Sequence, residues 1–146
     1  MPILLLLGAA APAWAQDATA CPQLPSGAEL TWEHRGTAGS DFCRALRADG
    51  SEAFGLYIAQ ESPFKPQRGN REETGRIAGK QVQWYRAEIA TRPGVKARET
   101  LIKLDDGRVA HLWLHAGSDE ALNQSFRLAE NLRFGGNRGS QVATGQ

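Results

Sequence analysis

Apolar and polar side chains alternate along several short stretches of this chain, with the period of two that is typical of β-strands. In residues 29–35, Leu30, Trp32 and His34 alternate with charged or hydroxyl side chains. A second stretch, residues 51–60, has apolar residues at every second position from 54 to 58. This pattern predicts strands with one face buried and the other turned to solvent.

Turn residues separate the predicted strands. Asp49-Gly50 lies between residues 42–48 and 51–60 and suits the positive φ angles of a tight hairpin turn. The first strand is predicted to end at a break covering residues 36–40. Within the predicted strand 51–60, Gly55 indicates a bulge or a close approach of another group to the backbone. Further hairpins are predicted for strands at 76–78, 81–89, 98–104 and 108–115, with turns at Gly79-Lys80, Pro93-Gly94 and Asp105-Asp106-Gly107.

Residues 61–73 are predicted to be a loop. Pro63 and Pro66 interrupt any regular element there, and charged side chains dominate the stretch. Phe64 is its one aromatic residue. Two roles fit Phe64, an anchor tucked onto the core or a contact with a binding partner, and the sequence leaves both open.

One amphipathic helix is predicted after the last hairpin. Ser118 is placed to cap it, and Asp119 and Glu120 put negative charge at the positive end of the helix dipole. Its apolar stripe can lie on a sheet. The fold class is therefore predicted to be α+β, an antiparallel β-sheet built of hairpins with a C-terminal helix packed on one face. The stripe consists of Leu122, Phe126, Leu128, Ala129 and Leu132.

The two ends of the chain differ in composition from its centre. Residues 1–15 join a short apolar run to Ala13-Trp14-Ala15, which has small residues where a signal peptidase requires them, and are predicted to be a cleavable signal peptide. Residues 16–28 are predicted to form an extended arm, residues 29–134 a single domain, and residues 135–146 a disordered tail. No other apolar run is long enough to cross a bilayer, so we expect no transmembrane segment in the mature chain and a periplasmic or secreted location.

Charge narrows the range of partners. The 146 residues carry 17 basic and 16 acidic side chains, for a net charge of +1, and the two signs are interspersed. A dedicated nucleic-acid binder would show a basic stripe. We therefore expect no nucleic-acid partner.

The two cysteines, Cys21 and Cys43, are predicted to form a disulfide that pins the arm to an early strand, because an oxidising compartment favours such bonds. A loop of this size would stabilise the fold by roughly 3 kcal/mol. The alternative is a lipid anchor on Cys21, since Ala18-Thr19-Ala20-Cys21 loosely resembles a lipoprotein cleavage box. That alternative would leave Cys43 as a free thiol.

The chain contains no complete catalytic, metal or nucleotide motif. His111 and His115 lie four residues apart on a predicted strand, about 13 Å from one another, which is too far to share a metal ion. Ser118 lacks the second glycine of a nucleophile elbow and is explained as a helix cap. We therefore expect no enzyme activity, no metal and no cofactor.

Large aromatic residues give the clearest indication of binding. Trp84 and Tyr85 are neighbours on a predicted strand, so they point to opposite faces of the sheet. Either both faces are covered or one of these residues is exposed, and exposed aromatic and Arg side chains are favoured in binding surfaces. The candidate binding residues are Trp84, Tyr85, Arg86, Phe64 and Arg98.

The last predicted strands and the helix follow one another in a recognisable order. Leu101-Ile102-Lys103-Leu104, the Asp106-Gly107 turn and the strand to His115 lead into the helix and then a short closing strand at 132–134. This layout resembles the C-terminal half of the PsbP/Mog1-like fold. Proteins of this fold are mostly assembly or binding factors that have no active site in common, so the resemblance implies such a factor here.

Together these patterns predict an exported protein of the bacterial envelope or periplasm that binds another envelope or secreted protein. It would act as an accessory factor, an inhibitor or an immunity-type partner. The alternative is a binder of a small molecule or cell-wall ligand, with the aromatic residues lining a pocket between helix and sheet. A hydrolase whose polar residues meet only in the folded protein is the third candidate.

Overall fold

The computed structural model describes residues 20–87 and 93–135. The predicted signal peptide at 1–15 lies outside the described residues, as do the first part of the predicted arm, the end of the predicted strand 81–89 and the tail after Gly135.

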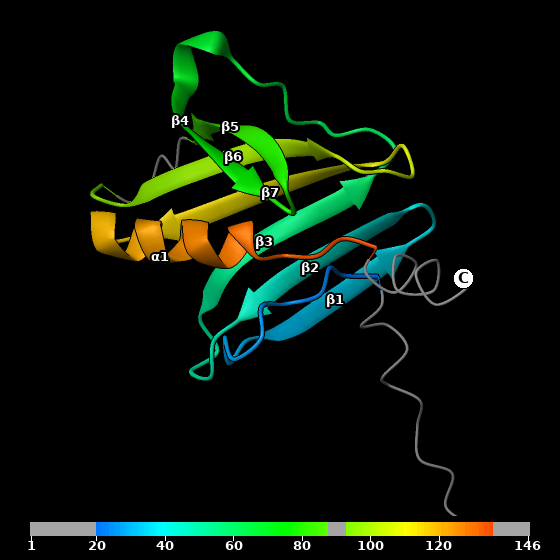
Figure 1. Cartoon of the computed structure of the whole chain (residues 1–146), viewed down its shortest axis with the longest axis horizontal. Helices are drawn as coiled ribbons and strands as arrows, with labels where there is room; N and C mark the ends of the chain where they lie inside the picture. Colours follow the sequence, from blue (N-terminus) through cyan, green and yellow to red (C-terminus); the bar gives the residue numbers. More distant parts are fainter. Residues whose placement is uncertain (1–19, 88–92, 136–146) are drawn as a thin grey trace, which may run out of the picture.

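The described residues form an antiparallel β-sheet of seven strands with one α-helix packed against it (Figure 1). This confirms the predicted combination of an antiparallel sheet and a C-terminal helix, with most of the fold in the sheet. No helix among the described residues is long and apolar enough to span a membrane. The elements are β1 (Thr31–Thr37), β2 (Ser40–Leu46), β3 (Glu52–Ala59), the short 3-10 helix η2 (Arg68–Asn70), β4 (Arg71–Ile77), β5 (Lys80–Arg86), β6 (Lys96–Lys103), β7 (Val109–Ala116) and α1 (Asp119–Glu130).

The strands lie in the order β1-β2-β3-β7-β6-β5-β4. Each half of the sheet is a meander of neighbouring strands, as the predicted hairpins require. The two halves join where β3 pairs with β7, through partners such as Leu56 and Leu112. This pairing brings together strands that are far apart in the sequence, and the alternation of side chains within single strands could not predict it.

Three predicted features differ from the structure. β4 begins at Arg71, inside the stretch predicted to be a loop, because an edge strand with mostly exposed side chains shows no apolar alternation. The closing strand at 132–134 is reduced to a single bridge between Gln23 and Arg133. The predicted break at 36–40 is shorter than expected, since β1 runs to Thr37 and β2 starts at Ser40.

The core lies between one face of the sheet and α1, which crosses the sheet in Figure 1. Alternate side chains of the central strands are buried there, including Leu56 and Leu112, neither of which has any exposed surface. The helix contributes Leu122 and Ala129, which are at most 4 % exposed. At its start the Ser118 hydroxyl accepts a hydrogen bond of 3.1 Å from the backbone N–H of Ala121, which confirms the predicted cap.

The Cys21–Cys43 disulfide attaches the arm to β2, as predicted. Both cysteines are buried, with Cys43 fully enclosed in the core. Two further contacts hold the arm in place. The Trp32 indole N–H donates to the carbonyl of Pro22 at 2.7 Å, and the backbones of Gln23 and Arg133 exchange two hydrogen bonds. Because its sulfur is bonded to Cys43, Cys21 is not free to carry a lipid in this structure.

Candidate functional site

The face of the sheet opposite α1 carries a continuous row of ring side chains, which we call the aromatic row. Its members are Phe42, Trp113, His111, Phe64 and Tyr85. The centroid distances between successive rings are 5.6 Å for Phe42 and Trp113, 5.4 Å for Trp113 and His111, 4.7 Å for His111 and Phe64, and 6.0 Å for Phe64 and Tyr85. Every member is partly exposed.

Strand alternation places these rings on the outer face. On β7, Leu112 and Leu114 point into the core and are fully buried, so His111 and Trp113 point the other way. The register across β2, β3 and β7 aligns Phe42 with Tyr57, and Tyr57 with His111. Residues from separate hairpins therefore meet on one face only after the two halves of the sheet have paired.

A glycine on the neighbouring strand determines how Trp113 lies. Gly55 on β3 is paired with Trp113, and a Cβ atom at residue 55 would stand only 2.4 Å from two carbons of the indole ring. The ring thus rests directly on the Gly55 backbone. This confirms the close approach that Gly55 indicated in the sequence.

Phe64 lies in the loop between β3 and η2. Its ring stacks on His111 with an angle of 8° between the planes, and it meets Tyr85 edge to face. Its backbone N–H donates to the Ser62 hydroxyl at 3.1 Å. Phe64 is therefore an anchor that holds this loop against the outer face, while its contact with a partner stays a prediction.

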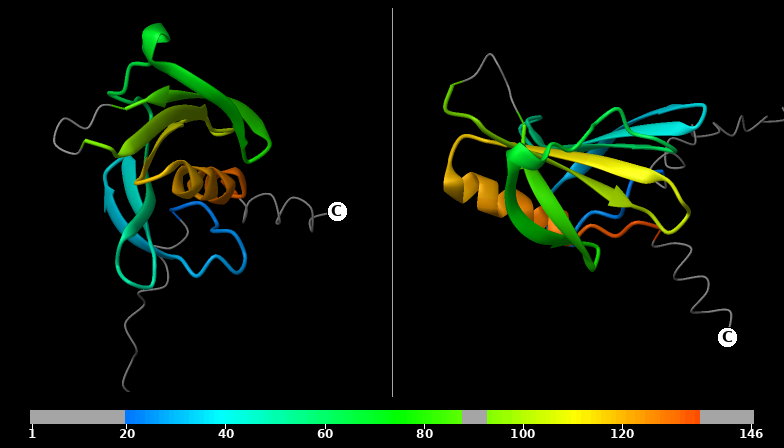
Figure 2. Two further views of the ribbon diagram at one scale, coloured as in Figure 1. Left: turned by 90° about the vertical axis from the view of Figure 1, so that its left-hand side faces the viewer. Right: turned by 90° about the horizontal axis from the view of Figure 1, so that it is seen from above.

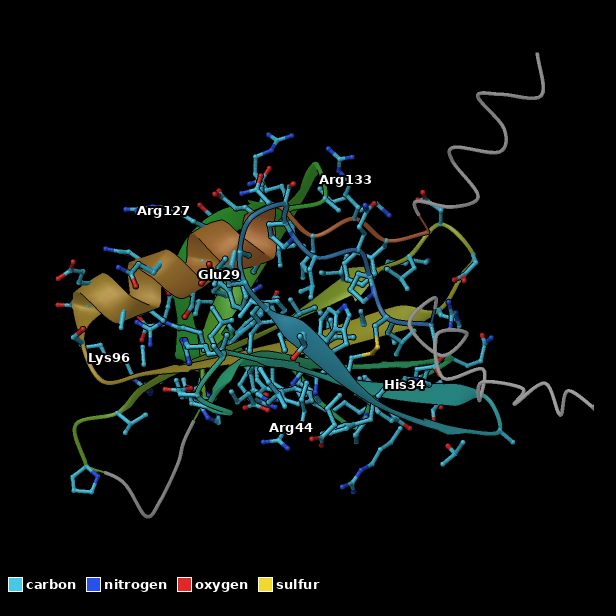
Figure 3. All side chains as sticks on the ribbon, turned by 90° about the horizontal axis from the view of Figure 1, so that it is seen from below. Glu29, His34, Arg44, Lys96, Arg127 and Arg133 are labelled. Carbon is cyan, nitrogen blue, oxygen red and sulfur yellow. A yellow bond between two sulfur atoms is a disulfide. The ribbon has the colours of Figure 1, made fainter. Side chains whose placement is uncertain are left out.

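Ion pairs border the aromatic row. His111 is 2.8 Å from the Glu99 carboxylate, and both side chains are about one-fifth exposed. On β2, Arg44 donates to Glu52 at 3.0 Å and to Glu33 at 3.1 Å. Hydrogen bonds to Glu52 and then to Glu33 raise the pKa of the Arg44 guanidinium above its usual value, so Arg44 stays charged. Figure 3 shows Arg44 on the side of the sheet away from the helix.

Two histidines pair with carboxylates, which is the arrangement that a hydrolase would need. His34 lies 2.9 Å from Asp41, and His111 lies 2.8 Å from Glu99. Neither pair has a free thiol as a nucleophile, since both cysteines are in the disulfide. Among the described residues, no three His, Cys, Asp or Glu side chains gather closely enough to hold a metal ion.

The structure separates the five residues predicted to bind. Phe64 and Tyr85 meet in the aromatic row. Trp84 is only 2 % exposed and packs against Phe126 of α1, so it belongs to the core. Arg86 on β5 and Arg98 on β6 are register partners on the face opposite Tyr85. Each forms an ion pair with an acidic side chain of β4, Arg86 with Glu72 and Arg98 with Glu73.

The prediction missed Phe42, Tyr57 and His111 as parts of one surface. A signal for this surface was present, because Trp113 lies between His111 and His115 on one face of the predicted strand. The pairing of β3 with β7 was not visible in the sequence, and only that pairing brings Phe42 and Tyr57 beside them.

Two grooves lie away from the aromatic row. One, of about 980 Å³, runs between the arm and the end of α1 and is lined by Leu24, Ala78 and Phe134 among others. The other, of about 270 Å³, runs between β4 and α1, with Trp84 in its wall.

No protein-family model matches this chain, and a search of curated proteins finds no match.

Proposed function

We propose that this is an exported binding or accessory protein of the bacterial envelope, which contacts another protein through the aromatic row. The observation that supports this most directly is the row itself, five touching rings that stay partly exposed on the face of the sheet that α1 leaves uncovered. Contiguous exposed apolar surface of this kind is typical of sites where proteins meet.

The geometry suits a binding surface in two ways. Each ring is already held by its neighbours, so little side-chain freedom would be lost when a partner binds. Trp, Tyr and Arg side chains are also the residue types that contribute most to protein interfaces. Arg44, fixed by Glu33 and Glu52 at the border of the row, supplies a charged rim around the apolar centre.

Export is supported by the disulfide and by the predicted signal peptide at residues 1–15. Disulfides persist in the periplasm and outside the cell, whereas the cytoplasm keeps thiols reduced. The likeness of residues 97–134 to the PsbP/Mog1-like fold, whose members are mostly assembly or binding factors, remains a prediction that agrees with this proposal.

A site-specific cross-linking experiment tests the proposal. The photo-reactive amino acid p-benzoylphenylalanine would be placed at Phe42 or Tyr85 in the aromatic row, and at Glu120 on the exposed side of α1 as the matched control. Irradiation in cells of the source organism should give one dominant protein adduct from positions 42 and 85 and none from 120.

The outcomes discriminate between the candidates. No adduct from the aromatic row, or the same adducts from Glu120, would refute a protein interface on this face. Adducts with cell-wall glycan from Phe42 and Tyr85 would support the alternative, a cell-wall ligand binder, in which the same rings stack on sugars.

A further inference from the structure

The groove between β4 and α1 is built differently from the aromatic row and lies on the other face of the sheet. Four consecutive residues of β4, Glu73–Arg76, form one wall. The other wall is one face of the helix, where Asn123, Phe126, Arg127 and Glu130 follow the i, i+3, i+4, i+7 spacing. Figure 2 shows the β4–β5 hairpin curling towards the helix, which creates this arrangement.

A hydrogen-bond donor of a largely buried residue opens into this groove. Trp84 is 2 % exposed and lines the groove, and its indole N–H has no acceptor among the described residues. A Cβ atom at residue 75 would lie 3.0 Å from the indole nitrogen. The donor is accessible because residue 75 is glycine. No buried side-chain nitrogen or oxygen among the described residues lacks a hydrogen-bond partner, so this N–H reaches solvent and is open to a ligand oxygen.

The wall formed by β4 is the free edge of the sheet. β4 is the last strand in the sheet order, and its residues 71–74 are exposed. An edge strand presents backbone N–H and C=O groups to which another extended segment can pair. The carbonyls of Glu72 and Glu73 accept from the Gln83 side chain, which leaves Thr74–Arg76 as free edge. Three residues of extended chain span about 10 Å, so this edge matches a peptide segment of about three residues.

Two acidic and two basic side chains line the groove, but among the described residues only one of them has an ion-pair partner outside it. Arg76 and Arg127 have no ion-pair partner in the described part of the chain, although Arg76 donates to the carbonyl of Gly79. Glu73 is held by Arg98, which leaves Glu130 as the one acidic group to oppose the two guanidinium groups. This excess of positive charge favours a ligand that carries a carboxylate.

We propose that this groove binds an extended peptide segment that bears a carboxylate. The peptide backbone pairs with the outer edge of β4, one of its carbonyls accepts from the Trp84 indole N–H, and its carboxylate pairs with Arg127. Because the groove and the aromatic row share no residue, this site does not depend on the function proposed above.

Titration of the isotope-labelled protein, followed by NMR, tests this site. The probes are three hexapeptides of alternating Val and Ser, one with a central Glu and both ends capped, one with Gln in its place, and one with a free C-terminal carboxylate. We expect saturable shifts of the Trp84 indole N–H and the Gly75 amide. The Gln peptide should bind roughly two- to fivefold more weakly than the Glu peptide, the range for an exposed ion pair.

The third peptide separates the two sources of the carboxylate. Tighter binding of the free C-terminus than of the central Glu would identify capture of a chain end, and the reverse would identify an internal acidic side chain. Absence of a shift at the Trp84 indole with all three peptides at millimolar concentration would overturn the proposal.

Two variants connect any binding to the groove. Gly75→Ala should weaken binding at least tenfold because its Cβ obstructs the indole N–H, whereas Gly69→Ala, where a Cβ meets nothing within 4 Å, should leave it unchanged. Arg127→Gln, at an exposed position on α1, should abolish the preference for the Glu peptide over the Gln peptide. Unchanged binding by Gly75→Ala would overturn the proposal, provided that its spectrum shows the native fold.

Discussion

Replacing Gly55 with alanine should disturb the aromatic row at its centre. The new Cβ would stand 2.4 Å from two atoms of the Trp113 ring, whereas ordinary contacts begin at 3.4 Å. The ring, which cannot bend, would have to move by about 1 Å, and overpacking of this kind costs roughly 1–3 kcal/mol. Alanine is favoured over glycine within a strand by about 0.5–1 kcal/mol. We therefore expect a net loss of about 1–2 kcal/mol in the free energy of unfolding.

Urea unfolding measures this loss, and the Trp113 indole resonance reports the movement of the ring. Gly69→Ala is the matched control, because a Cβ there meets nothing, and its stability should be within about 0.5 kcal/mol of the wild type. The Trp113 ring contacts Phe42 and His111, so their resonances should shift as well.

A double-mutant cycle with Trp113→Leu separates the clash from other effects. If the indole ring is the obstacle, Gly55→Ala should be neutral or slightly stabilising once Trp113 has been replaced. A Gly55→Ala variant as stable as the wild type, with an unmoved Trp113 resonance, would exclude the clash. An equal loss of stability in the Trp113→Leu background would exclude the indole ring as the obstacle.

Three further changes test other parts of the fold. Replacing both Cys21 and Cys43 with serine should lower the free energy of unfolding by about 3 kcal/mol, because the disulfide closes a loop with a sequence separation of 22. Urea unfolding of this variant, compared with the reduced wild-type protein, measures the loss. Ser118→Ala should lower it by about 1 kcal/mol through loss of the helix cap, and an unchanged midpoint would contradict that role. Asp49 accepts hydrogen bonds from the Ser51 hydroxyl and, with a smaller effect, from the Ser51 backbone N–H, and both lower the pKa of its carboxyl group. These bonds therefore stabilise the fold at pH values above the usual carboxyl pKa. Their contribution is lost as the pH falls through the lowered pKa. NMR titration of Ser51→Ala should show the pKa of Asp49 moving up towards 3.8, and no movement would exclude the hydroxyl as the main cause.

Local features of the fold were open to prediction because they depend on neighbouring residues. Asp49-Gly50 lies at the predicted hairpin turn, and Gly50 adopts the positive φ of 85° that such a turn requires. The Ser118 cap starts the helix where the sequence indicated. β4 was missed at its start because Arg71 and the residues after it are exposed at the sheet edge, and their sequence has no apolar alternation.

The candidate site was predictable only in part. Adjacency on one strand established that Trp84 and Tyr85 point to opposite faces, but not which of them α1 would cover. The helix packs on Phe126 and Trp84, which buries Trp84 and leaves Tyr85 outside. Which of the two residues is buried depends on the face on which α1 packs. Because α1 is far from β5 in the sequence, no local pattern predicts it.

Four features could be predicted from the amino-acid sequence alone: the class of fold, most of the turns, the helix with its cap, and the disulfide between Cys21 and Cys43. Each of these follows from side-chain periodicity, turn chemistry or residue type within a short stretch of chain. The pairing of β3 with β7 could not be predicted in this way, and it is this pairing that brings Phe42, Trp113 and Tyr85 into one row across five strands. Such a surface arises from long-range strand pairing and from the side of the sheet that the helix covers, and both depend on the packing of the whole core.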